Sequence, residues 1–90
     1  MKSGQTEVEI MACLCRLAAE QVSLDVQVVT PDSDLFADLN FDSLDAVEFV
    51  MKVEDEFDVS IDDRQAEGVR TPRQALAMLM AGLESRPTPS

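Results

Sequence analysis

Apolar residues recur at helical intervals in several stretches of the chain. The first stretch begins near Thr6, which has Glu9 three residues later in the spacing of a capping box. Ile10 and Leu14 then follow four residues apart, with further apolar residues beside them. This pattern predicts a helix over about residues 7–21.

The segment 42–58 predicts a second helix with apolar residues on two sides. When it is placed on a helix at about 100° per residue, the apolar residues separate into two groups. The larger group predicts the core face: Ala46, Phe49, Val50, Val53 and Phe57. The smaller group, Leu44, Val47 and Met51, lies nearly opposite among acidic residues. Unless another helix covers it, such a stripe faces solvent and marks a contact site for another molecule.

Two further helix starts follow. A short helix is predicted within residues 61–69, beginning at Asp62 or Asp63. Thr71 and Pro72 then supply an N-cap and a first-position proline, which predict a third long helix. Its expected buried stripe is Ala75, Leu76, Leu79, Met80 and Leu83. The final residues, 85–90, contain two prolines and no apolar anchor, so we expect a flexible tail.

Residues 22–42 show no helical repeat. They include a β-branched run near Val28, but nothing else in the chain could pair with a strand there. We therefore expect a long ordered loop, pinned by Leu35, Phe36 and Leu39. The predicted fold is all-α: a small four-helix bundle with three main helices, one short helix and a long loop between the first two. A chain of 90 residues has room for one such domain, with an ordered core over about residues 5–84.

The composition excludes several kinds of chemistry. The chain has no histidine, so it cannot hold a Ser-His or Cys-His nucleophile pair. Cys13 and Cys15 lie two residues apart on a predicted helix and project in different directions, which fits neither a zinc site nor a redox pair. We expect reduced thiols, no metal site and no enzymatic activity.

The charge restricts the partners. The formal net charge of −11 would repel nucleic acids and anionic membrane surfaces, so basic proteins are the expected partners. No apolar run is long enough to suggest a signal peptide or a membrane span, and we therefore expect a cytoplasmic protein.

The run 38–50, with the sequence DLNFDSLDAVEFV, resembles the prosthetic-group attachment motif of acyl carrier proteins. The resemblance continues through the acidic stretch to Asp63. It implies that Ser43, followed by Leu44, accepts 4'-phosphopantetheine from coenzyme A through a phosphopantetheinyl transferase. The local physics agrees, because Asp42 is a good N-cap and places Ser43 at the first helical position, near the positive end of the helix dipole.

The resemblance also implies the function. Such a carrier holds acyl intermediates as thioesters and presents them to partner enzymes of fatty acid, polyketide or specialised lipid biosynthesis. Acyltransferases, ketosynthases and related enzymes would dock basic patches on the helix after the modified serine, and the carrier itself would be a monomer. The implied contacts are Asp42, Leu44, Asp45, Val47, Glu48, Met51, Glu54, Asp55 and Asp58.

Members of the family shelter the acyl chain between their helices. The matching positions are Leu14, Leu35, Phe36, Phe41, Val53, Ile61, Ala66, Val69 and Ala75. All nine are apolar, which permits a pocket, although the same residues would also serve as an ordinary core.

Two positions depart from the usual family pattern. Asn40 stands where the family most often has glycine, and asparagine tolerates a left-handed backbone better than most residues. Phe41 is bulkier than the usual small residue, so we expect it to narrow the pocket entrance or to alter how the arm lies, and it weakens the case for the housekeeping carrier of fatty acid synthesis. Two alternatives stay open: a peptidyl carrier loaded with an aminoacyl group, and an acidic helical adaptor in which Ser43 is never modified.

Overall fold

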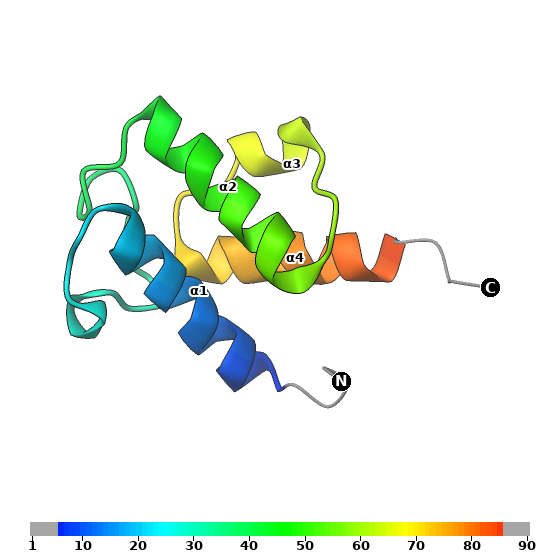
Figure 1. The fold of residues 1–90 in the computed structure, drawn as a ribbon, viewed down its shortest axis with the longest axis horizontal. Coiled ribbons are helices and arrows are strands. Elements are labelled where there is room, and N and C mark those ends of the chain that lie inside the picture. Colours follow the sequence, from blue (N-terminus) through cyan, green and yellow to red (C-terminus); the bar gives the residue numbers. More distant parts are fainter. Residues whose placement is uncertain (1–5, 86–90) are drawn as a thin grey trace.

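The computed structural model describes residues 6–85. Its helices, shown in Figure 1, are α1 (Glu7–Gln21), the short 3-10 helix η1 (Val26–Val28), α2 (Ser43–Phe57), α3 (Asp63–Glu67) and α4 (Pro72–Ser85). The prediction of an all-α fold with three main helices and one short helix is confirmed. The bounds predicted for the first helix agree with those of α1, whose start carries the predicted capping box between Thr6 and Glu9.

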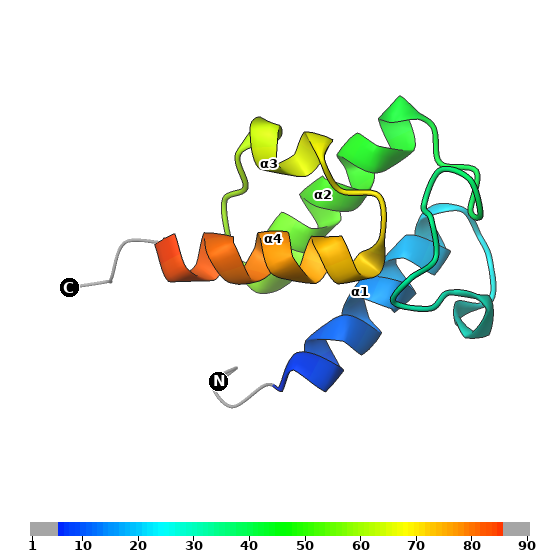
Figure 2. The same ribbon diagram turned by 180° about the vertical axis from the view of Figure 1, so that it is seen from behind.

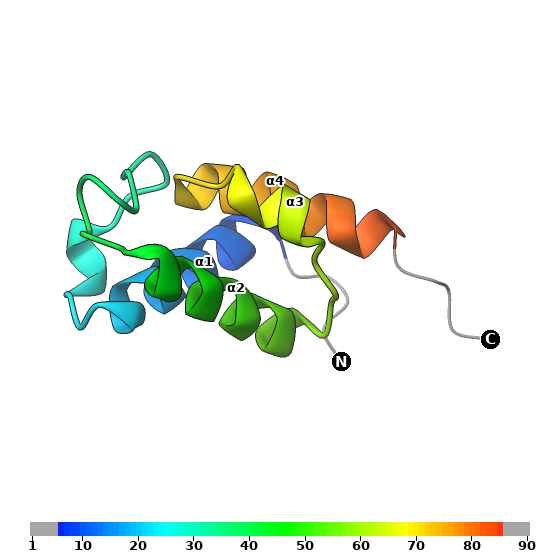
Figure 3. The same cartoon turned by 90° about the horizontal axis from the view of Figure 1, so that it is seen from above.

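The helices pack around one apolar core. Helices α1 and α2 run side by side in opposite directions, and α4 crosses behind them, as Figure 2 shows from the other side. Helix α1 contacts both α2 and α4, whereas α3 contacts α4 and lies above α2 in the view of Figure 3. Leu14, Phe49, Val53 and Leu79 are among the fully buried side chains. The predicted core face of α2 is confirmed, since its remaining members are partly buried against this core.

Helix α4 buries more than its predicted stripe. Ala75 and Leu79 are buried as expected, and Leu76, Met80 and Leu83 are partly buried against the core. Met78 is buried as well, although the helical repeat did not select it. Because α4 contacts both α1 and α3, a wider arc of its surface is covered than one neighbour alone would cover.

The loop over residues 22–42 is ordered and pinned as predicted. Leu35 and Leu39 are buried, and Phe36 packs against the core. The sequence did not predict η1, which begins where the Asp25 carboxylate accepts the backbone N–H of Gln27 at 2.9 Å. No strand occurs within residues 6–85.

Helix α4 extends to Ser85, so the first residue of the predicted tail is helical. The rest of that tail, residues 86–90, and Gln5 at the start of the expected ordered core lie outside the described residues. Over residues 6–85, no helix combines the length and apolar character needed to cross a bilayer.

Candidate functional site

The start of α2 is fixed by a reciprocal cap. The Asp42 carboxylate accepts the backbone N–H of Asp45 at 2.8 Å, and the Asp45 carboxylate accepts the backbone N–H of Asp42 at 3.1 Å. Both donors would otherwise lack a partner at the helix end. Asp42 is therefore the N-cap and Ser43 the first residue of α2, as the sequence predicted.

The turn before the cap has the backbone geometry that the sequence suggested. Asn40 adopts a φ of 62°, in the left-handed region that asparagine tolerates. The backbone N–H of Phe41 then donates to the carbonyl of Leu35 at 3.0 Å, which closes the loop onto the start of α2. These contacts bring the chain into α2 with Ser43 exposed to solvent.

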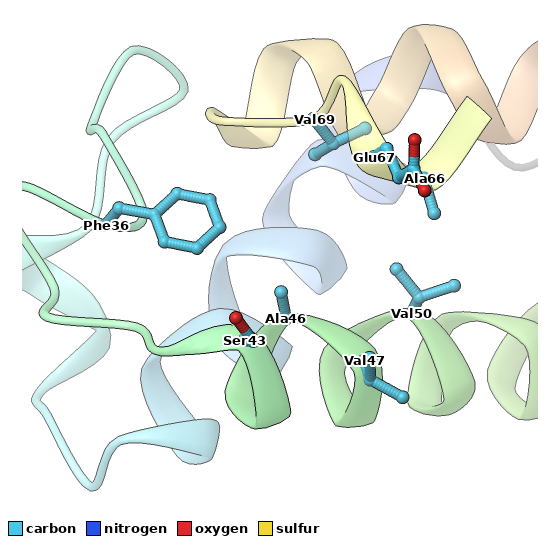
Figure 4. Close-up of a pocket in the computed structure, with 8 residues that line it drawn as sticks. All are labelled: Phe36, Ser43, Ala46, Val47, Val50, Ala66, Glu67 and Val69. Carbon is cyan, nitrogen blue, oxygen red and sulfur yellow. The ribbon is translucent and has the colours of Figure 1, made fainter. Parts of the chain in front are cut away.

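A pocket opens between α2, α3 and the loop, beside Ser43. Its volume is about 600 Å³, and Figure 4 shows Ser43 at the end nearest the loop. The lining is mostly apolar and consists of Phe36, Ser43, Ala46, Val47, Val50, Ala66, Glu67 and Val69. An exposed hydroxyl thus lies at the edge of a cavity that can hold an apolar chain.

The pocket overlaps only partly with the positions implied by the family resemblance. Phe36, Ala66 and Val69 line it. The other six lie buried in the core: Leu14, Leu35, Phe41, Val53, Ile61 and Ala75. The sequence analysis did not assign Ala46, Val47, Val50 or Glu67 to a pocket. A signal did exist on α2, since the pocket lies along the boundary between the two apolar groups of the helical wheel.

Phe41 does not line the pocket. Its ring is buried and meets the rings of Phe36 and Phe49 edge to face, with centroid distances of 6.3 and 5.9 Å. Phe41 therefore does not narrow the pocket entrance. It packs inside the core against Phe36, which does line the pocket.

The outer face of α2 carries an exposed apolar stripe. Leu44, Val47 and Met51 are 63%, 54% and 56% exposed, so the prediction that this stripe faces solvent is confirmed. The charged positions of the predicted contact surface lie around it. Asp42, Glu48, Asp55 and Asp58 are exposed, while Asp45 and Glu54 are partly buried.

Three of these carboxylates also accept hydrogen bonds from other segments of the chain. Glu54 accepts the backbone N–H of Ile61 at 2.7 Å. Asp45 and Glu48 share the side-chain amide of Gln21, whose Nε2 donates to them at 3.0 and 2.8 Å. The Gln21 hydrogen bond, with the backbone hydrogen bond of Asp42, holds the pKa of Asp45 below its ordinary value. Gln21 was missed by the sequence analysis, because it lies on α1, far from α2 in the sequence.

The cysteines lie apart from this site. Cys13 is partly buried and Cys15 is buried, and desolvation raises the pKa of both thiols. Since the thiolate is the reactive form, neither side chain is activated for thioester chemistry. Within residues 6–85, no cluster of side chains is arranged to hold a metal ion.

Comparison with known proteins agrees with this geometry. Residues 13–79 match the family model described as a phosphopantetheine attachment site. The chain is 40% identical over 76 residues to the acyl carrier protein of Prochlorococcus marinus, and the matched region covers 84% of this chain and 95% of that protein. It is 42% identical over 65 residues to the acyl carrier protein of Helicobacter hepaticus, over 72% of this chain and 86% of that one.

Solved structures give the same result. The acyl carrier protein of Thermotoga maritima matches with a TM-score of 0.74 and 27% identity, over 91% of this chain and 95% of that chain. The acyl carrier protein of Enterococcus faecalis matches with a TM-score of 0.70 and 28% identity, over 87% and 99% of the two chains. The chain therefore belongs to the acyl carrier protein family, whose members are carriers rather than enzymes and hold their acyl groups on covalently attached 4'-phosphopantetheine.

Proposed function

We propose that Ser43 is the attachment residue for 4'-phosphopantetheine and that the chain forms one carrier domain. The observation that carries this proposal is the exposed Ser43 hydroxyl, at the first position of α2 and at the edge of an apolar pocket. When bound, the group supplies a thiol on a flexible arm, which neither cysteine of the chain offers.

The residues around Ser43 suit a phosphodiester. The first turn of a helix presents backbone N–H groups and the positive end of the helix dipole, both of which favour an anion. Asp42 sets where that turn begins, because its side chain caps the Asp45 N–H. Leu44 follows on the exposed side of the helix, where a transferase can contact it.

The acyl chain would occupy the pocket beside Ser43. Phe36, Ala46, Val50, Ala66 and Val69 offer apolar contacts there, and removing a chain from water stabilises it by about 0.8 kcal/mol per buried methylene. The six predicted positions in the core would be reached only by a chain that separates the helices.

The family works with phosphopantetheinyl transferases and with enzymes that use acyl carriers. For this chain, we assign their docking to the exposed stripe of α2 and the carboxylates around it. Most of the eighteen Asp and Glu residues lie between Asp32 and Asp63, where Lys52 is the only basic residue. Charge of one sign accelerates encounter with basic patches and leaves binding sensitive to salt, which suits transient contacts made by a monomeric cytoplasmic shuttle.

The test is the intact mass of the protein before and after incubation with coenzyme A, magnesium and a phosphopantetheinyl transferase. Wild type should gain the mass of one phosphopantetheinyl group, and Ser43→Ala should gain none. Ser60→Ala is the matched control, because Ser60 is also exposed but lies outside the attachment motif. If folded wild type gains no mass with several transferases, the attachment proposal fails and the unmodified acidic adaptor becomes the better explanation.

A further inference from the structure

One wall of the pocket comes from the loop rather than from a helix. Phe36 is the one residue of the loop over residues 22–42 among those that line the cavity. The guanidinium carbon of Arg70 lies 5.0 Å from the centre of its ring, which is cation–π distance. The ring of Phe41 meets the same ring edge to face. The position of this wall therefore depends on a cation outside the core and an aromatic ring inside it.

Arg70 is itself held in place by the loop. Its Nε and Nη2 lie 3.4 and 3.5 Å from the two carboxylate oxygens of Asp34. The Arg70 carbonyl accepts the backbone N–H of Leu35 at 2.7 Å. Toward α4, the backbone N–H of Arg70 donates to the side-chain oxygen of Gln74 at 2.7 Å. Arg70 thus joins the loop to the start of α4 through both its side chain and its backbone.

Asp34 organises the same contact from the loop. Its Oδ1 accepts the backbone N–H groups of Phe36 and Ala37, each at 2.8 Å. The Ala37 bond, with the Phe36 bond and the charge of Arg70, holds the pKa of Asp34 below its ordinary value. One carboxylate therefore fixes the backbone of Phe36 and the cation that covers its ring.

We propose that Arg70 is a positioning residue that holds Phe36 as a fixed wall of the pocket and so determines which acyl chains fit beside Ser43. This inference rests on the proposed function of the pocket. Val69, the residue before Arg70, lines the pocket from the side of α3. The Arg70 contact thus sets the separation between the loop wall and the α3 wall.

The chain offers a matched control for a purely structural role. Arg73 also ties the loop to α4, because its Nε lies 2.8 Å from the Asp32 carboxylate and its backbone N–H donates to the Pro31 carbonyl. No contact of Arg73 with an aromatic ring or the pocket occurs among the described residues. Arg73→Gln removes a comparable ion pair and leaves the wall in place.

The experiment compares acylated holo-proteins that carry saturated chains of increasing length. The rate of thioester cleavage by hydroxylamine measures how well each chain is sheltered. In Arg70→Gln, short-chain thioesters should be cleaved about two- to fivefold faster, the factor expected from losing an exposed cation–π contact. The best-sheltered length should also shift to longer chains. Arg70→Lys should restore the wild-type profile, because it returns a cation over the ring.

A second readout needs no acyl group. The chain contains four phenylalanines and no Trp, Tyr or His, so all aromatic proton signals come from phenyl rings. Comparison with Phe36→Leu identifies the Phe36 signals. These should move in unloaded Arg70→Gln and stay in Arg73→Gln. Phe36→Leu should itself reproduce the altered cleavage profile, and it stands in for Arg70→Gln if that variant does not fold.

The inference is overturned if Arg70→Gln keeps the wild-type length profile, if Arg73→Gln changes it equally, or if Arg70→Lys fails to restore it. These outcomes leave the carrier function intact, because they require a loaded protein. If the wild type accepts no phosphopantetheinyl group, the proposed function is refuted, and the inference with it.

Discussion

The cap at the start of α2 gives a sharp test of how Ser43 is positioned. Asp42→Ala removes the acceptor of the 2.8 Å hydrogen bond from the Asp45 backbone N–H, whereas the backbone N–H of residue 42 can still donate to the Asp45 carboxylate. Loss of an N-cap side chain costs about 1 kcal/mol of unfolding free energy. For a domain of this size that corresponds to a melting temperature lower by about 4–8 °C.

Asp42→Ala also removes a negative charge from a chain of net charge −11. The weaker repulsion between carboxylates raises the melting temperature and so opposes the effect of the lost cap. Asp42→Asn separates the two effects, because asparagine loses the charge but still caps the helix. It should melt at or slightly above the wild-type temperature. Thr6→Ala is a second control, since it opens the other capping box, at the start of α1, and leaves the surroundings of Ser43 unchanged.

The assay is thermal unfolding followed by circular dichroism, together with the initial rate of mass gain in the transferase reaction below all melting temperatures. Asp42→Ala and Thr6→Ala should lose similar stability, but only Asp42→Ala should be modified more slowly. The reasoning is refuted if Asp42→Ala is as stable as Asp42→Asn, or if Thr6→Ala slows the modification equally.

Further predictions concern the core, acid stability, salt and the thiols. Leu14→Ala should lower the unfolding free energy in urea titrations by about 2–5 kcal/mol, because Leu14 is fully buried; a loss near zero would contradict the described core. The pKa of Asp34 is lowered chiefly by its bond to the Ala37 N–H, so the stability it adds is present above its ordinary pKa of 3.8 and lost as the pH falls below that value. Wild type should therefore melt above Asp34→Asn at pH values well above 3.8, and the difference should vanish in stronger acid. Added salt or divalent cations should raise the melting temperature by screening the carboxylates, and a melting temperature indifferent to both would count against that repulsion. Alkylation at neutral pH should label the free thiol of the unacylated phosphopantetheine arm before Cys13 or Cys15; equal rates would contradict the raised pKa values.

The sequence was sufficient for features that depend on neighbours along the chain. Capping boxes and helical repeats are local, so α1 and the exposed stripe of α2 could be predicted closely. The left-handed backbone at Asn40 belongs to the same class, because residue type and turn geometry decide it together. The small 3-10 helix at residues 26–28 was missed because its β-branched residues do not favour a helix, and the Asp25 cap outweighs that preference.

Features formed between distant segments could not be predicted in this way. Gln21 and Asp45 meet only because α1 and α2 run side by side, and Asp34 meets Arg70 only because the loop folds back onto the start of α4. The pocket was located imprecisely for the same reason. Apolar character alone cannot distinguish a side chain such as Val53, which is sealed in the core, from Val50, which borders a cavity.

The position of helix α3 at the pocket affects how such carriers can evolve. It has five residues and supplies Ala66 and Glu67 to the pocket, while the fully buried side chains come mainly from the longer helices and the loop. Substitutions at these two positions would reshape the cavity without removing a fully buried side chain. The preference for one acyl chain over another can therefore diverge between related carriers while their stability and shared partners are retained.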